Sequence, residues 1–525
     1  MEHAMRPLIA ALILIGCGGD KDSDTTDTST ETGTETETET ETETGTETET
    51  ETETGTETET ETETETAQAY AFDSAFGDGS SVSYSGQIAR HVLIHDMTDW
   101  IATLTADIPT NYAPVAGDVT ADLMFYFDYT AAVGANIAHD VTTDVPDAMV
   151  MQVTYGGKYD GVSSGDKPLR AKLAGNDPAG QYADWNGVDG PSAFVGWGDS
   201  GLTPTQLVET WIGMLDDQAV DWVGGDYPLG PDGTPVPYVY ITPQGHDLEQ
   251  LLQKFLLGSI AFSQGADDYL DDDTAGKGLM SSHEAPTAGL YTDLEHQWDE
   301  GFGYFGAART YGSWTDDQIK ALDADVDGDG KIDLNSEYCW GHSVNAAKRD
   351  FDAIVETDFT ADAWDGFIHG RTLLSETAGT ALTDTQMTEL QGYRDHALEA
   401  WEKAIAATVV HYINDTLMDY DNMMGTSGKP YSFEDHAKHW SELKGFALSL
   451  QFNRRSPMID DDTPYVNEFA MLHELLGTAP VLETADDATI NAYTDGLLQA
   501  RSMMGEIYNF DEENLGDETK GTYGW

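Results

Sequence analysis

Carboxylates at alternate positions make residues 325–337 the strongest candidate for a metal site in the sequence. A loop that starts at Asp325 has acids at its first, third and fifth positions and Gly330 at its sixth. Calcium prefers about six to eight oxygen ligands, which such a loop can supply. The twelfth position is Ser336, where loops of this type have Glu, and the Glu comes one residue later. The expected calcium ligands are Asp325, Asp327, Asp329, Lys331 through its carbonyl, Asp333 and Glu337. The alternative is an acidic, Gly-rich surface turn.

A second candidate lies in the segment Glu-His-Gln-Trp-Asp-Glu. His296, Asp299 and Glu300 are three and four residues apart, so an expected helix presents them on one face. Histidine with carboxylates at this spacing can bind zinc or iron. Because His296 points away from the apolar stripe that contains Trp298, the alternative is a solvated polar face. The segment lacks the two histidines that flank Glu in zinc proteases.

A third candidate surrounds Lys-His-Trp-Ser-Glu. His436, His439 and Glu442 lie on one expected helix, and both histidines are on or beside the apolar stripe that contains Trp440. A pair of histidines three residues apart is suitable for a metal, but most buried histidines are simply hydrogen-bonded in a core. The other helical histidines are interpreted as having no matching partner at a useful spacing: His91, His95, His369 and His411.

Helical periodicity dominates the elements that must position these residues. Strand signals are scarce, and residues 157–245 are rich in Gly, Asp and Pro, which indicates a partly irregular insertion with one helix at 203–215. The sequence therefore predicts a mainly α protein. The expected helices are 86–105, 121–139, 247–264, 286–306, 340–356, 360–377, 384–420, 432–452, 463–476 and 487–508.

The N-terminal residues are typical of an export signal. A short apolar run, 7–15, follows Arg6 and is too short to span a bilayer. It leads into Leu-Ile-Gly-Cys, which resembles the bacterial lipobox, in which the Cys is acylated after cleavage. We therefore expect residues 1–16 to be a lipoprotein signal peptide and Cys17 to carry palmitate or a related acyl chain. The alternative is an ordinary signal peptide with a fortuitous Cys. The expected location is the bacterial cell envelope, on the outer rather than the inner membrane.

Acidic residues outnumber basic ones by 96 to 24, which gives a formal charge of −72. This balance excludes nucleic-acid binding, because phosphates require basic contacts. Residues 20–66 are nearly all Thr-Glu repeats with no apolar side chain to bury, so 17–66 is predicted to be a disordered linker. Residues 67–525 still carry about −54 and contain enough aromatic residues for a core, so we expect one helical globular domain there.

Several short sequence motifs of this domain resemble those of an uncharacterised family. They are Tyr-Ser-Gly-Gln at 84–87 and the segments 295–306, 327–333, 345–350 and 438–446. The chain is similar over nearly all of 67–525 to the domain-of-unknown-function family numbered 4856, found in bacterial surface lipoproteins. The resemblance extends distantly to the imelysin-like proteins, which implies a helical bundle and a link to iron uptake. Imelysins carry Gly-x-His-x-x-Glu, whereas this chain has Leu294 for the Gly and Asp299 for the Glu.

The leading hypothesis is a non-enzymatic lipoprotein that acquires or handles a metal, iron above all. Its expected partners are the lipid bilayer, through Cys17, and an outer-membrane metal-uptake receptor. One alternative is a metal-dependent hydrolase or peptidase, and another is a calcium-stiffened module that binds protein or glycan. The metal hypotheses are supported if the ligands around His296 lie near those around His439. The binding-module hypothesis is supported if the two groups are far apart.

Overall fold

Helices make up most of the chain in the computed structural model. The structure describes residues 68–134, 150–151, 159–177, 180–188, 190–286, 289–321, 324–460, 463–465, 467–517 and 522–525. The expected signal peptide, Cys17 and the linker up to residue 66 lie outside the described residues. Internal contacts divide the chain into units 1–65 and 66–525, and every described element belongs to the second unit. No helix in the described ranges has the length and hydropathy that a bilayer-spanning segment needs.

The prediction of a mainly α fold is confirmed. The α-helices are α1 (Ser85–Asp107), α2 (Asp118–Phe127), α3 (Ala131–Gly134), α4 (Tyr159–Val162), α5 (Pro204–Gly224), α6 (Leu248–Leu256), α7 (Asp293–Phe305), α8 (Asp316–Lys320), α9 (His342–Asp352), α10 (Phe359–Thr377), α11 (Asp384–Met424), α12 (Phe433–Ser449), α13 (Glu468–Leu476), α14 (Asp487–Tyr508) and α15 (Glu512–Leu515). Two-residue strands form a parallel pair, β1 (Val150–Met151) with β2 (Lys331–Ile332), and an antiparallel pair, β3 (Gly516–Asp517) with β4 (Thr522–Tyr523).

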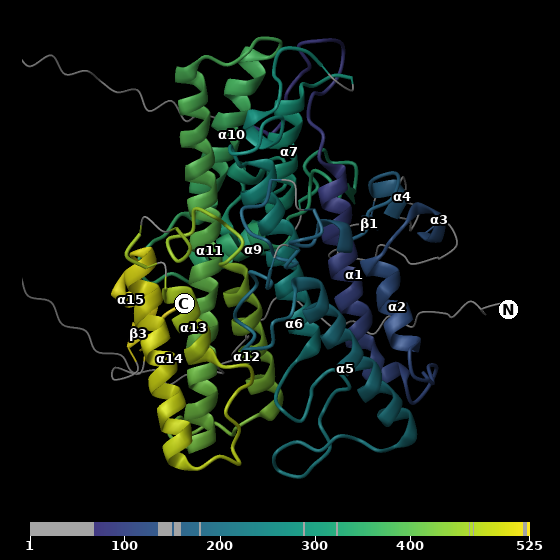
Figure 1. The fold of residues 1–525 in the computed structure, drawn as a ribbon, viewed down its shortest axis with the longest axis vertical. Coiled ribbons are helices and arrows are strands. Elements are labelled where there is room, and N and C mark those ends of the chain that lie inside the picture. The colour runs from purple at the N-terminus through teal and green to yellow at the C-terminus, as the bar shows by residue number, and fades with distance from the viewer. Residues whose placement is uncertain are drawn as a thin grey trace, which may run out of the picture. The chain divides into compact units, whose positions relative to one another are not determined.

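The longest helix, α11, supports much of this unit. It begins at a capping box between Thr383 and Gln386 and ends where Gly425 adopts a left-handed conformation, with φ of 71°. Its 41 residues correspond to a length of about 60 Å. Helices α9, α10, α12 and α14 all pack against it, and Figure 1 shows it as the long green helix. Candidate residues on α12 are therefore held against a continuous rigid element.

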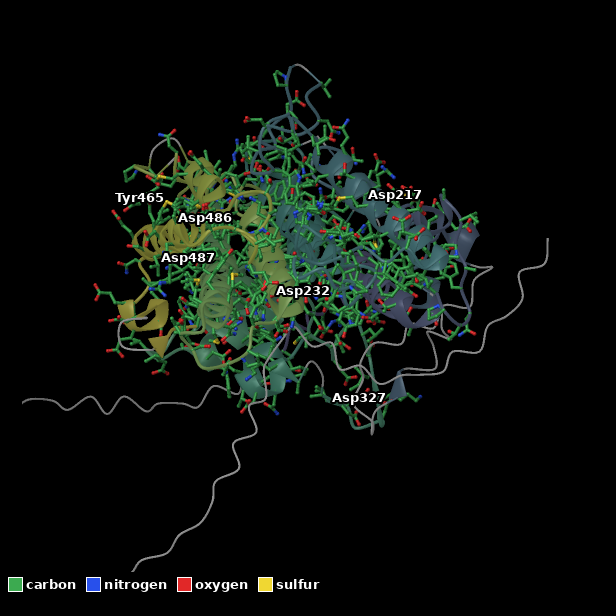
Figure 2. The ribbon with its side chains drawn as sticks, turned by 90° about the horizontal axis from the view of Figure 1, so that it is seen from below. Asp217, Asp232, Asp327, Tyr465, Asp486 and Asp487 are labelled. Carbon is green, nitrogen blue, oxygen red and sulfur yellow. The ribbon has the colours of Figure 1, made fainter. Side chains whose placement is uncertain are left out.

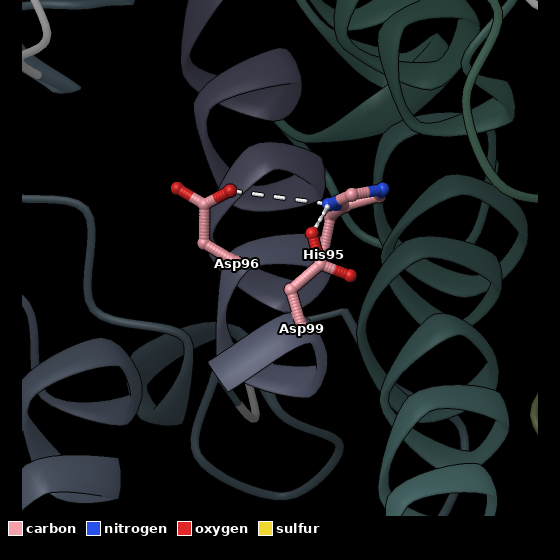
Figure 3. A group of neighbouring side chains, drawn as sticks. All are labelled: His95, Asp96 and Asp99. Atoms are coloured by element: carbon pink, nitrogen blue, oxygen red, sulfur yellow. Dashed lines mark ion pairs between the residues drawn. The ribbon is translucent and has the colours of Figure 1, made fainter. Parts of the chain in front are cut away.

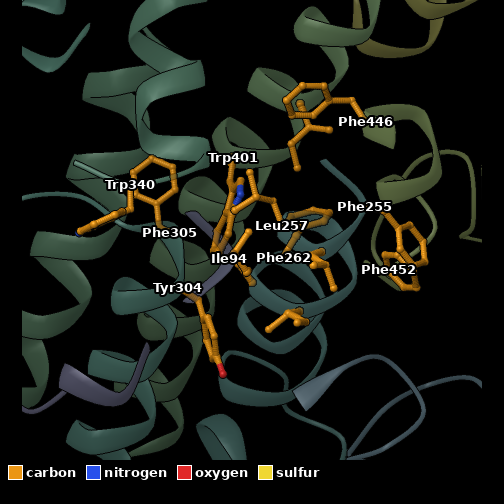
Figure 4. Packing of buried hydrophobic residues seen from close by; sticks show 14 of the residues in the cluster. Ile94, Phe255, Leu257, Phe262, Tyr304, Phe305, Trp340, Trp401, Phe446 and Phe452 are labelled. Carbon is orange, nitrogen blue, oxygen red and sulfur yellow. The ribbon is translucent and has the colours of Figure 1, made fainter. Parts of the chain in front are cut away.

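Aromatic side chains fill the space between α7, α11 and α12 (Figure 4). The ring of Trp401 on α11 is fully buried and lies 5.2 Å from Phe305 and 5.3 Å from Phe262, between ring centroids. Its indole N–H donates to Nδ1 of His342 over 2.8 Å. Burial of such rings stabilises a fold through both apolar area and ring geometry. The end of α7 is thus fixed to the middle of α11.

The helix expected at 247–264 differs from the observed structure. It continues as α only to Leu256, after which two π-helical segments, Leu257–Phe262 and Gly265–Tyr269, carry the chain onward. Close contacts explain the small residues there, because a Cβ on Gly258 would lie 1.9 Å from Oγ of Ser449 on α12. The wider π turns keep this segment buried where α12 approaches it.

Several other expected helices have different bounds, and the one expected at 463–476 begins at Glu468. Helix α7 begins at Asp293 rather than at residue 286, because Thr292 and Glu295 form a capping box that fixes its first turn. In place of one helix at 121–139, the described residues contain α2 from Asp118 and the short α3. The region 157–245 is partly irregular, as predicted, although its main helix, α5, extends to Gly224.

The contact between α7 and α10 provides a test of the packing. A Cβ added to Gly370 on α10 would lie 2.0 Å from Cζ2 of the buried Trp298. We expect Gly370→Ala to lower the free energy of unfolding by about 2 kcal/mol or more, because the indole cannot move away without strain. Gly392→Ala on α11 is the matched control, since no atom lies within 4 Å of its added Cβ.

The control substitution should be neutral or should stabilise the protein by up to about 1 kcal/mol, because Ala favours helix. Chemical denaturation of both variants measures the difference. Equal stability of the two variants would contradict the packing of α7 on α10.

Candidate functional site

The acidic loop folds around the carboxylate of Asp325. Its two oxygens accept hydrogen bonds from the backbone N–H groups of Gly328, over 2.8 Å, and Gly330, over 2.9 Å. Oδ1 of Asp327 accepts from Asp329 N–H over 3.0 Å. These bonds wind the chain tightly, and Gly328 and Gly330 both have φ near 75–79°, which glycine adopts without steric cost. The carboxylates of Asp325 and Asp327 therefore lie close to each other.

Glu337, the residue that comes one place later than expected, closes this loop. Its side chain is only 6% exposed, and Oε1 accepts from the N–H of Val326 and of Asp327 while Oε2 accepts from Asp333 N–H over 2.9 Å. Carboxylate oxygens of Asp325, Asp327 and Glu337 lie within 4.8 Å of one another. The extra residue is accommodated by the turn in which Glu337 N–H donates to Asp333 O.

The other expected calcium ligands lie along the same loop. Oδ1 of Asp329 accepts from the N–H of Lys331, which belongs to β2 and pairs with Val150 of β1. Oδ1 of Asp333 accepts from Asn335 N–H over 2.9 Å. Figure 2 shows Asp327 at the edge of the molecule, so the tip of the loop faces solvent while Glu337 is buried at its base.

The three residues of the second candidate lie on α7, but their side chains point to different sides of the helix. Nδ1 of His296 lies 3.0 Å from Ser83 O, and Nε2 lies 3.7 Å from Oε1 of Glu300. The same Glu300 oxygen accepts from the amide of Gln87 over 2.8 Å. Asp299 is fully buried and faces the core, away from this partly exposed pair. The three residues therefore do not form one ligand group, contrary to the expectation from their spacing.

Asp299 belongs to a buried ion pair instead. Its Oδ1 accepts from Arg371 Nε over 2.8 Å and from the hydroxyl of Tyr70 over 2.9 Å, and its Oδ2 accepts from Ser83 N–H. Burial raises the pKa of Asp299 even though Arg371 acts in the opposite direction. A second acid, Glu295, accepts from Nη1 of Arg371 over 3.0 Å. Both carboxylate oxygens of Asp299 are therefore bound to groups of the protein itself.

The histidines of α12 have different surroundings. His436 is fully buried, its Nδ1 lies 3.1 Å from the hydroxyl of Tyr431, and burial lowers its pKa to about 3. His439 has its Nδ1 2.8 Å from Oδ2 of Asp419. Burial alone would lower the pKa of His439, but Asp419 and two further acids raise it to about 9. His436 is therefore neutral at pH 7, and His439 is the cation of an ion pair.

Glu442 lies on the same helix but has other partners. Its Oε1 accepts from the hydroxyl of Tyr412 over 2.8 Å and lies 3.5 Å from Nζ of Lys254. Both Glu442 and Lys254 are 1% exposed. The negative charge of Glu442 is thus balanced by the buried Lys254, so Glu442 does not need a metal ion as its partner.

The candidate residues of α7 and α12 do not meet. Figure 1 shows α7 towards one end of the unit and α12 in the opposite half. Their partners also differ, since those of α7 are Ser83, Gln87, Tyr70 and Arg371, whereas those of α12 are Tyr431, Asp419, Tyr412 and Lys254. The two groups therefore do not form one shared metal centre.

Helix α1 carries a further group of possible ligands that was not predicted from the sequence. His95 was interpreted as having no partner at a useful spacing, yet its Nδ1 lies 3.1 Å from Oδ2 of Asp99 and 3.9 Å from Oδ1 of Asp96 (Figure 3). Ligand atoms of the three residues lie within 4.8 Å of one another. The signal in the sequence was the His-x-x-x-Asp spacing, which places His95 and Asp99 one helical turn apart.

The ion pairs of Arg371 predict a stability effect that depends on pH. Arg371→Met should cost about 3–5 kcal/mol, because it leaves Asp299 and Glu295 buried without a cation. Loss of the arginine raises the pKa of Asp299 further in the folded state. The cost should therefore be smallest at low pH, grow as the pH rises from the pKa of Asp299 in the unchanged protein to its higher pKa in the variant, and stay constant above that.

Denaturant unfolding at pH 5 and pH 7 measures this dependence. Lys403→Met is the matched control, since its 2.7 Å contact with Glu399 is partly exposed and worth well under about 1 kcal/mol. A similar cost for both variants would show that Arg371 is not essential to the core.

Comparison with known proteins bears out the resemblance to the uncharacterised family. The model described as "Domain of unknown function (DUF4856)" matches residues 215–476, a narrower range than the 67–525 expected. This range includes the acidic loop, α7 and α12 but not α1. Searches of the curated proteins and of the solved structures found no match, so the imelysin-like part of the resemblance stays a prediction. The chain belongs, through residues 215–476, to the domain-of-unknown-function family numbered 4856.

Proposed function

We propose that this protein is a lipid-anchored envelope protein that works as a calcium-stiffened module for binding protein or glycan. The observation that carries this proposal is the convergence of Asp325, Asp327 and Glu337, whose carboxylate oxygens lie within 4.8 Å. Without a cation, their charges repel one another, and a bound calcium ion removes that repulsion. The two metal hypotheses that depend on α7 and α12 have weaker support, because their candidate ligands are separated and occupied by protein partners.

The hydrogen bonds of the loop are compatible with a calcium ion and indicate its affinity. A carboxylate offers about four lone-pair sites. Glu337 already accepts three backbone hydrogen bonds, so about one of its lone-pair sites is left for a cation. Asp325 accepts two, so about two of its sites are left. Bidentate binding by the closing Glu, which strong sites use, is therefore impeded. We expect a dissociation constant in the range of extracellular modules, about 10⁻⁴ to 10⁻³ M.

Calcium at this position would fix the loop to the core. The exposed tip carries Asp327, while the base is attached through Tyr84, whose hydroxyl donates to Asn335 O over 2.9 Å, and through Arg309 N–H, which donates to Ser336 O. A cation shared by Asp327 and Glu337 would join tip and base directly. We infer that the stiffened loop presents a fixed outer surface to a partner, with the linker 17–66 holding the unit away from the membrane.

Calcium titration tests the loop. We expect about 10 mM calcium to stabilise the protein by roughly 1.4 kcal/mol if the dissociation constant is about 1 mM, a rise in melting temperature of roughly 1 to 2 °C. Asp327→Asn keeps the acceptor for Asp329 N–H but removes a charge, so it should weaken calcium binding at least tenfold. Magnesium should substitute poorly, because it sheds water reluctantly.

Calorimetric titration and thermal unfolding measure these effects. Asp217→Asn is the matched control, because it removes the same charge from an exposed position on α5 (Figure 2). If both variants retain the calcium response of the unchanged protein, the response comes from general screening of the acidic surface, and the loop is only a turn.

Acylation of Cys17 is tested separately. Cys17→Ala should release the protein from the membrane fraction and abolish labelling with a radioactive fatty acid, because the acyl chain on Cys17 is the proposed anchor. Cys339→Ala is the control, since that thiol is buried in the core and should leave labelling unchanged. Membrane retention and labelling that persist in Cys17→Ala would exclude lipidation at this residue.

A further inference from the structure

We propose that His95, Asp96 and Asp99 on α1 bind a divalent transition-metal ion. This inference is independent of the calcium loop, and α1 lies outside the residues matched by the family model. It depends on one nitrogen and two carboxylate oxygens that converge within 4.8 Å on a single helical turn. Figure 3 shows the side chains of Asp96 and Asp99 directed towards the same ring nitrogen of His95.

The separations suit a tetrahedral ion. Zinc with bonds of about 2.0 to 2.1 Å keeps its ligand atoms roughly 3.3 to 3.4 Å apart. Nδ1 of His95 lies 3.1 Å from Oδ2 of Asp99 and 3.9 Å from Oδ1 of Asp96, so the observed values lie on either side of that separation. A small change in side-chain torsion would bring both distances into range.

The histidine nitrogen lies between two carboxylates. Nδ1 of His95 is buried, and its contacts are the ion pairs with Asp99 and Asp96, neither of which is an aligned hydrogen bond. Buried polar atoms are nearly always hydrogen-bonded. A metal ion placed between the three ligand atoms would replace these ion pairs with coordinate bonds.

The surrounding residues hold the ligands in position. Asp96 is only 8% exposed, and its Oδ2 accepts from the hydroxyl of Tyr159 over 2.7 Å, which leaves Oδ1 directed at His95. The ring of His95 packs edge-on against Trp340, with 6.2 Å between ring centroids. Asp99 is 38% exposed, so the ion can enter from solvent on that side. Such outer contacts orient ligands at metal sites.

The ligand set identifies the class of metal. Imidazole with carboxylates suits zinc, iron, cobalt, nickel or manganese, whereas calcium requires more oxygens than three residues supply. Two aspartates balance the charge of a dication. Three protein ligands leave one coordination position for water, as in zinc sites that carry a water molecule.

Titration of the metal-free full-length protein with zinc, followed by calorimetry, tests the proposal, and cobalt supplies a visible absorption band that reports nitrogen and oxygen ligation. We expect His95→Gln and Asp99→Asn each to weaken zinc binding at least tenfold and to change the cobalt spectrum. Asp99 is partly exposed, so this variant keeps its fold even if His95→Gln does not, and circular dichroism verifies this.

His296→Gln is the matched control. His296 has a carboxylate at the same four-residue spacing, but Ser83 O lies 3.0 Å from its Nδ1, and no third ligand joins it in the described part of α7. Zinc affinity should be unchanged in this variant. The proposal is overturned if the unchanged protein binds no zinc, if Asp99→Asn binds it as tightly, or if His296→Gln removes the tightest site. His95 would then be only the partner of an ion pair with Asp99.

Discussion

The guanidinium of Arg371 joins three segments that are far apart in the sequence, and the arrangement of the unit depends on it. It has no exposed surface, and it donates to Glu295 and Asp299 of α7 and to the hydroxyl of Ser81. Asp299 in turn accepts from Tyr70, so the segment before α1 is bound to α7 and α10 through one ion pair. Removal of Arg371 would leave Asp299 and Glu295 buried without a cation, so this guanidinium holds α7 against α10.

The distribution of the basic residues determines which acidic side chains have no basic partner and could bind a cation. The chain has only 24 basic residues against 96 acids, and several of the basic ones are inside, such as Arg371, Lys254 and Lys444. Buried acids such as Glu442 consequently have protein partners, whereas acids at the surface have few cations near them. In such a protein, a cation would be most stabilising where the fold brings acids together without a basic partner. The two groups of that kind in the described residues are the acidic loop and the group on α1.

Helix type and position could be predicted from the sequence where apolar periodicity and caps agreed. The helix at 487–508 was predicted with its observed bounds, and α10 differs by one residue. Spacing failed for Asp299, because its position relative to His296 suggested a shared ligand face, whereas its true partner, Arg371, lies 72 residues further along the chain. Glu337 was an expected ligand although it comes one position late, and the tight turn after Asp333 that brings it to Asp325 and Asp327 could not be foreseen from loop positions. A residue's neighbours on a helix are visible in the sequence, but its partners in the fold are not.

The two candidate cation sites both lie next to Trp340. The indole N–H of Trp340 donates to Leu334 O near the end of the acidic loop over 3.1 Å, and its ring contacts His95 on α1. The chain between Leu334 and Trp340 also contains Glu337, the buried base of the loop. If a bound ion moved Glu337, the change would reach the His95 ring through this contact, and any effect of one ion on the affinity for the other would be reciprocal. Trp340 is thus the residue that contacts both candidate groups.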